Sequence, residues 1–159
     1  MRRPPELAGR PEEDIVGRPP RAILLAAIAG LGLVIAAYLT WTKLTGAIPP
    51  CLPGGGCATV EASVYSAVAG VPVALFGVAY SVLTLALALA WWRRGERRAL
   101  LLAYGLGLAG VLVEAFLVYL ELFVIRAVCV WCVVYGVTVV AGFVVATWAV
   151  SARGPASGR

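Results

Sequence analysis

The sequence contains no histidine, asparagine or glutamine, and charged residues make up only 13% of its 159 positions. The absence of histidine excludes histidine-ligated haem, histidine-rich zinc sites and Ser-His or Cys-His catalysis. An ordinary soluble domain is about 45–50% apolar, whereas this chain is 62% hydrophobic. The composition therefore predicts an integral membrane protein, and the net charge of +5 is not taken as a sign of nucleic-acid binding.

Four apolar segments are each long enough to cross a bilayer as a helix. They cover about residues 22–42, 71–92, 99–120 and 129–150. We expect an all-α integral membrane protein: a four-helix transmembrane bundle at 21–150, with a short amphipathic helix at 58–69 in an outer loop. The segments 1–20 and 151–159 are rich in Pro, Gly, Ser and Arg and are expected to be tails, the first of them disordered. Close helix contacts in the third span are expected at its glycines, Gly105, Gly107 and Gly110.

The distribution of positive charge predicts the direction of the helices. Eleven of the thirteen basic residues lie in three polar segments, residues 1–21, 93–98 and 151–159. The two remaining loops contain only Lys43 and Arg126. By the positive-inside rule, both termini are cytoplasmic and the loops at 43–70 and 121–129 face outward.

All four cysteines fall in or beside these outward loops, where disulfides persist. Cys51 and Cys57 flank a segment rich in proline and glycine. Cys129 and Cys132 form a C-x-x-C motif at the start of the last span, where unpaired N–H groups and the helix dipole favour a thiolate. A mobile pair beside an anchored pair is typical of a relay that works by thiol–disulfide exchange.

Two other interpretations of the cysteines stay open. The spacings C-x5-C and C-x2-C do not forbid a four-cysteine metal site, and both pairs can be structural disulfides. In that case the protein is a non-enzymatic metal carrier or a structural membrane protein. We favour the relay without a metal, because a C-x-x-C bridge closes too small a loop to constrain the unfolded chain much.

The order of the motifs adds a family resemblance. Three glycines precede Cys57, Ser63 follows six residues later, Gly70 and Pro72 lead into the second span, and residues 119–132 end in the C-x-x-C. In this combination, over about residues 21–150, the chain resembles bacterial members of the vitamin K epoxide reductase family. The resemblance implies a quinone-dependent protein-disulfide oxidoreductase in the bacterial cytoplasmic (inner) membrane.

The same resemblance implies partners and roles. A separate thioredoxin-fold oxidoreductase outside the membrane would be reoxidised, and electrons would pass to a membrane quinone, menaquinone or ubiquinone. By position, Cys51 would meet the partner, Cys57 would exchange with Cys129, and Cys132 would face the quinone. The animal enzymes use an Asn near the start of the second span to bind vitamin K, and this chain has none.

Contacts to the quinone must then come from hydroxyl, indole or backbone groups. We expect them from Ser63, Tyr135 and Trp131, although Trp131 also suits an interfacial anchor. Glu114 lies well inside the third span, where a carboxyl is a candidate for function or for a hydrogen bond between helices. Glu121 lies near the outer end of that span and is expected to be solvated.

Overall fold

The computed structural model describes residues 20–51 and 55–152 and confirms the predicted four-helix bundle. The long helices are α1 (Pro20–Thr45), α3 (Val73–Arg94), α4 (Arg97–Tyr119) and α5 (Val130–Ser151). A π-helical turn, η3 (Leu120–Ile125), extends α4. The outer loop carries α2 (Cys57–Ala62), the 3₁₀ turn η2 (Val64–Ser66), and the two-residue strands β1 (Ala67–Val68) and β2 (Val71–Pro72). Most of the two predicted tails lies outside the described residues.

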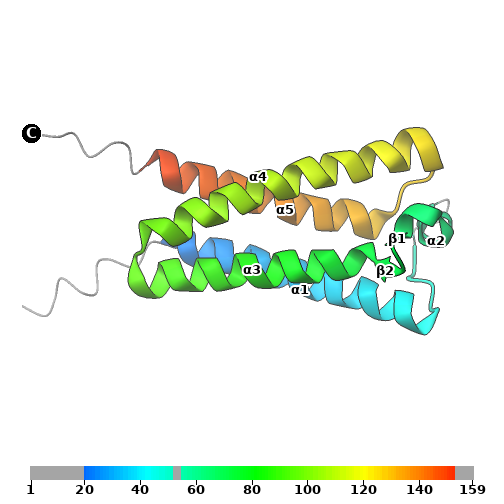
Figure 1. The fold of residues 1–159 in the computed structure, drawn as a ribbon, viewed down its shortest axis with the longest axis horizontal. Helices are drawn as coiled ribbons and strands as arrows, with labels where there is room; N and C mark the ends of the chain where they lie inside the picture. Colours follow the sequence, from blue (N-terminus) through cyan, green and yellow to red (C-terminus); the bar gives the residue numbers. More distant parts are fainter. Residues whose placement is uncertain (1–19, 52–54, 153–159) are drawn as a thin grey trace, which may run out of the picture.

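The four long helices lie side by side along the length of the molecule (Figure 1). α1 packs against α3 and α5, and α4 packs against α5 and α3. α1 begins and α5 ends at one end of the bundle, while α2, β1 and β2 lie at the opposite end (Figure 1). Each long helix is apolar enough to cross a membrane, so the chain is a multi-pass membrane protein.

The loop helix is shorter than the sequence predicted. It ends before Ser63, whose backbone is extended (φ −70°, ψ 154°). The remaining residues of the segment expected to be helical form η2 and then β1, which pairs with β2 in antiparallel so that Val68 lies opposite Val71. The turn between these strands places Ala69 and Gly70 at positive φ, 52° and 82°, which no helix contains. Pro72, which leads into the second span, precedes α3 as its N-cap.

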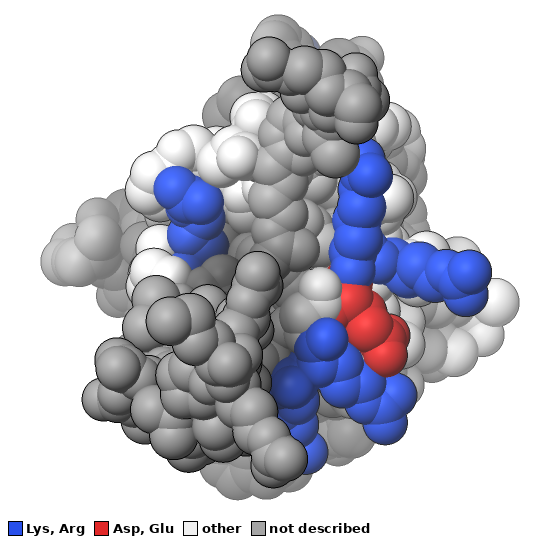
Figure 2. Space-filling model, turned by 90° about the vertical axis from the view of Figure 1, so that its left-hand side faces the viewer, with Lys and Arg blue, Asp and Glu red and all other residues white. Residues whose placement is uncertain are grey.

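The tightly packed core lies at the end of the bundle away from the cysteines. It is built from buried side chains of all four long helices, chiefly Leu25, Trp91, Leu100, Val145 and Ala149. The surface of this end is basic (Figure 2). Arg21 lies over the Trp148 ring at 4.1 Å, and Arg94 pairs with Glu96 at 3.5 Å.

Two of the three glycines expected at helix contacts are found there. A Cβ on Gly107 would lie 3.2 Å from Phe143 Cδ2 of α5, and one on Gly110 would lie 2.6 Å from Tyr80 Cε2 of α3. Gly105 is different, because a Cβ there would meet nothing within 4 Å. The expectation for Gly105 was therefore wrong: this glycine is exposed and makes no close contact with a neighbouring helix.

This difference predicts the effect of a matched pair of substitutions. Gly107→Leu should lower the free energy of unfolding by roughly 1–3 kcal/mol, because the new side chain must push α4 from α5. Gly105→Leu adds the same side chain to the same helix without a clash, and should leave stability unchanged or raise it. Thermal unfolding in detergent micelles measures both, and equal stabilities would contradict the assigned α4–α5 contact.

Candidate active site

The first cysteine pair is a disulfide, Cys51–Cys57, with Cα atoms 6.1 Å apart. Cys57 begins α2 and is only 1% exposed, whereas Cys51 is half-buried. The loop pair therefore has one accessible and one enclosed sulfur.

The second pair sits at the N-terminus of α5. Cys129 is the N-cap residue, and its sulfur accepts a hydrogen bond from the Cys132 N–H at 3.4 Å. Cys129 lies just before the membrane-spanning helix, and hydrogen bonding from the Cys132 side chain is the main cause that lowers its pKa to about 7. Cys129 is therefore placed to react as a thiolate near neutral pH.

A backbone contact joins the two pairs. The Gly56 N–H donates to the Val128 carbonyl at 3.0 Å. A Cβ on Gly56 would lie 2.5 Å from Ala127 Cβ and 2.9 Å from Val128 N, so only glycine lets the two segments approach this closely. Each bonded residue is followed directly by a cysteine, Cys57 on one side and Cys129 on the other. The sequence contained the glycines, but gave no sign that Gly56 is the contact.

Glu121 lies against the C-x-x-C motif. Its Oε2 accepts the Cys129 N–H at 3.2 Å, and its carboxyl also interacts with the Cys132 side chain. Glu121 is 6% exposed, so the expectation that it is solvated was wrong. The cause is η3: the helix widens into a π turn and ends at Arg126 with φ 56°, and the Ala127 N–H returns to the Glu121 carbonyl at 3.0 Å.

Trp131 points to the outer loop. Its indole N–H donates to the Pro50 carbonyl at 2.9 Å, and its ring lies 5.1 Å from that of Tyr38. Trp131 therefore ties the residue before Cys51 to the start of α5. It is not among the described residues that line the cavity below.

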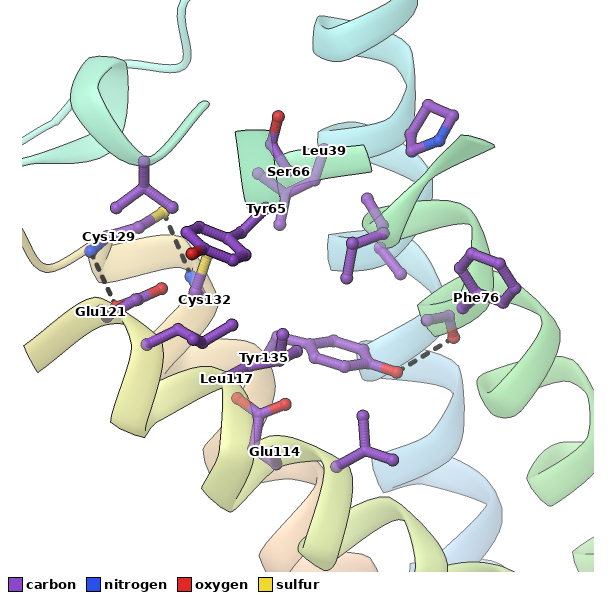
Figure 3. Close-up of a pocket in the computed structure, with 18 of the residues that line it drawn as sticks. Leu39, Tyr65, Ser66, Phe76, Glu114, Leu117, Glu121, Cys129, Cys132 and Tyr135 are labelled. Carbon is purple, nitrogen blue, oxygen red and sulfur yellow. Dashed lines mark hydrogen bonds between the residues drawn. The ribbon is translucent and has the colours of Figure 1, made fainter. Parts of the chain in front are cut away.

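A cavity of about 350 Å³ opens beneath the loop elements, between the four long helices. Cys129, Cys132 and Glu121 line its outer end, and Tyr135 and Glu114 lie further along it (Figure 3). Most other lining residues are apolar, among them Leu39, Phe76, Val113 and Leu117. Its size and lining are typical of a site for a small, mainly apolar molecule.

Ser63 and Tyr135, two of the predicted quinone contacts, line this cavity, but their hydroxyls are engaged elsewhere. Tyr135 donates to the Gly77 carbonyl at 3.0 Å, and its oxygen lies 3.4 Å from Ser81 Oγ. Ser63 donates to the Val60 carbonyl at 2.7 Å. In this structure both side chains therefore shape the wall without offering a free hydroxyl proton.

Lys43 fastens the loop helix to the end of α1. Its Nζ donates to the Glu61 carbonyl at 2.6 Å and to Ser66 Oγ at 2.8 Å, and lies 3.3 Å from Glu61 Oε1. In the sequence, Lys43 bore only on the prediction of helix direction, as one positive charge. That it is the sole lysine of the chain was the available sign of a specific role.

The environment of Cys129 predicts a pH dependence. In the reduced protein, alkylation of Cys129 by iodoacetamide should rise with pH through a midpoint of about 7, well below the ordinary thiol value of 9.0. Because the Cys132 side chain is the main cause, Cys132→Ala should move the midpoint upward. Mass spectrometry of the labelled peptide reports each midpoint, and an unchanged midpoint in Cys132→Ala would contradict the assigned cause.

The chain also matches a family model. Residues 23–147 match the vitamin K epoxide reductase family, and the match includes the outer loop and all four cysteines. It thus covers well over half of the chain and the whole of the candidate site. The chain belongs to the vitamin K epoxide reductase family, which makes it an oxidoreductase that acts on disulfides in a membrane.

Proposed function

We propose that the protein reoxidises a thioredoxin-fold partner outside the cytoplasm and passes the electrons through its two cysteine pairs to a membrane quinone. The reaction supports disulfide-bond formation in other proteins. The observation that carries this proposal is the Gly56–Val128 hydrogen bond, because it holds the enclosed cysteine of one pair beside the reactive cysteine of the other. A scaffold or a metal carrier has no need of this arrangement.

The proposed orientation places the cysteines at the outer face of the cytoplasmic membrane and both termini in the cytoplasm. It is supported by the basic surface at the opposite end of the bundle (Figure 2). Arg21 near the start of α1, Arg93 near the end of α3 and Arg97 at the start of α4 lie at that end. The outer end holds Lys43, which is paired with Glu61, and Arg126. Disulfide chemistry requires the oxidising side of the membrane.

The roles of the loop cysteines follow from their exposure. Cys51 is the more accessible sulfur and is proposed to form the mixed disulfide with the partner. Cys57 then carries the electrons inward by attacking the Cys129–Cys132 disulfide at Cys129. Each exchange forms one S–S bond as another breaks, so the number of disulfide bonds stays constant while the disulfide passes from one cysteine pair to the next.

The cavity fits a quinone ring by its size, its apolar lining and its opening onto Cys132. When bound, a quinone accepts two electrons and two protons. Cys132 is proposed as the thiol that faces it, with Ser63 and Tyr135 in the wall. Trp131 is proposed to hold Pro50, and through it Cys51, in place against the C-x-x-C motif.

The proposal is tested by anaerobic turnover. Purified protein mixed with a dithiol and a short-chain quinone should bleach the quinone absorbance catalytically. Cys51→Ser should abolish oxidation of a thioredoxin-fold substrate, while its prereduced Cys129–Cys132 pair should still reduce one equivalent of quinone. Zinc bound stoichiometrically, with no turnover by the wild type, would favour a metal carrier instead.

Removing Cys132 should trap the relay between the pairs. In Cys132→Ser the Cys129 thiolate can attack Cys57 of the Cys51–Cys57 disulfide, which releases Cys51 as a thiol. No Cys132 thiol is present to resolve the new Cys57–Cys129 bridge, so this bridge should accumulate in the oxidised protein. Non-reducing peptide mapping identifies it. A dominant Cys51–Cys129 bridge would reverse the roles of the two loop cysteines.

Gly56→Ala tests the contact without touching a sulfur. The added Cβ must displace Ala127 and weaken the bond to Val128, so transfer between the pairs should slow by roughly 100-fold, the cost of about 1 Å of misplacement. Gly30→Ala is the matched control, since a Cβ there meets nothing within 4 Å. The rate is read from stopped-flow reduction of the Cys129–Cys132 pair, and equal rates in both variants would show that the contact is dispensable.

A further inference from the structure

Glu114 is a carboxyl enclosed by the helices, in the wall of the cavity. It is 8% exposed on α4, and its side chain packs against Gly136 of α5, where a Cβ would overlap Glu114 Oε1. Within the described part of the chain it makes no hydrogen bond and no salt bridge. Gly136 lies one turn beyond Cys132, so the carboxyl lies deeper in the bundle than the reactive thiols.

The Glu114 carboxyl faces the cavity that is proposed to hold the quinone. Glu114 lines it together with Cys132 and Tyr135 (Figure 3). The hydroxyl protons of Tyr135, Ser63 and Ser66 are donated to backbone carbonyls, and the side chains of Tyr65 and Tyr80 also line the cavity. A lone carboxylate among apolar side chains is costly, so the protonated acid is the form that these surroundings favour. Glu114 then offers a proton to the cavity, since its carboxyl makes no hydrogen bond to another of the described residues.

Glu121 lines the same cavity, at the end nearer the cysteines. It lies seven residues further along, about two helical turns or roughly 10 Å from Glu114 along the axis. It contacts the Cys129 N–H and the Cys132 side chain at the N-terminus of α5, where the helix dipole favours a negative charge. One carboxyl is therefore at the thiols, and the other is deeper along the cavity.

We infer that the two carboxyls manage the protons of quinone reduction: Glu121 accepts the Cys132 thiol proton, and Glu114 donates a proton to the quinone oxygen at the deep end. This inference rests on the proposed function. It identifies two catalytic residues in a step for which the cysteines supply only electrons.

The step balances. Cys129 enters as a thiolate, having released its proton to water, and the Cys132 S–H bond breaks as its proton passes to Glu121. An S–S bond forms between the two sulfurs, and two electrons go to the quinone. One quinone oxygen receives the proton held by Glu121, and the other receives the proton of Glu114. Glu114 recovers its proton from water, which matches the one that Cys129 released.

The first readout uses protein with both cysteine pairs oxidised, so that no turnover occurs. Infrared difference spectra on adding a short-chain quinone should show the carbonyl band of a protonated carboxylic acid shifting to lower frequency. The band should be lost in Glu114→Gln and retained in Glu96→Gln, a matched change on the exposed loop at the opposite end. No such band, or a band that quinone does not shift, would overturn the role of Glu114.

The second readout is alkylation of Cys132 in the fully reduced protein without quinone. Glu121→Gln should slow it by roughly 100-fold if the carboxylate is the base. A carboxylate that acts only by its charge repels the thiolate, so its removal would speed alkylation and overturn the role of Glu121. Glu114→Gln should leave this rate unchanged.

The kinetic arm separates this inference from the proposed function. Glu114→Gln should lower kcat for quinone reduction by roughly 100-fold, while reduction of the Cys51–Cys57 disulfide by a dithiol stays at the wild-type rate. If the wild type reduces quinone and Glu114→Gln does so equally fast, the inference is wrong and the proposed function stands. If the wild type itself does not reduce quinone, the proposed function fails.

Discussion

One backbone hydrogen bond, from Gly56 to Val128, determines how the outer half of this protein is arranged. It joins a loop after the first span to the connection before the last, and the two residues that follow it are cysteines. Several other contacts hold the same two segments in place. Lys43 secures α2 to the end of α1, and Trp131 holds Pro50 over the start of α5. The absence of a side chain at position 56 is what makes the approach possible.

The two ends of the bundle differ: one is tightly packed, and the other contains the four cysteines. Away from the cysteines, Trp91, Leu100 and their neighbours fill the space between the helices. At the cysteine end the helices enclose a cavity instead, and polar side chains such as Glu114, Glu121 and Tyr135 lie in its wall. A cavity lined by apolar side chains forfeits packing contacts. The filled end therefore offsets the packing contacts that the cavity end lacks.

The four-helix architecture was predictable from the sequence because it depends on properties that are averaged over many residues. Four spans follow from hydropathy over about twenty residues, and the cysteine pairs from their spacing. The family resemblance, taken from ordered motifs, is confirmed by the match over residues 23–147. The directions of individual side chains were harder to predict. Trp131 turns toward Pro50 and away from the cavity, and Tyr135 lines the cavity but gives its proton to Gly77. These outcomes depend on single contacts between distant segments, which periodicity does not encode.

The π turn at Leu120–Ile125 has a consequence for the spacing of the chain. An α-helix rotates each successive side chain by about 100°, so one residue more or fewer shifts the angular phase of everything that follows. The π turn absorbs such an extra residue within one turn. Deleting one residue here would therefore restore a regular α turn without rotating Arg126 and the connection to Cys129 around the axis. The π turn thus adds one residue at the end of α4 and still keeps the connection to Cys129 at the same angular position around the helix.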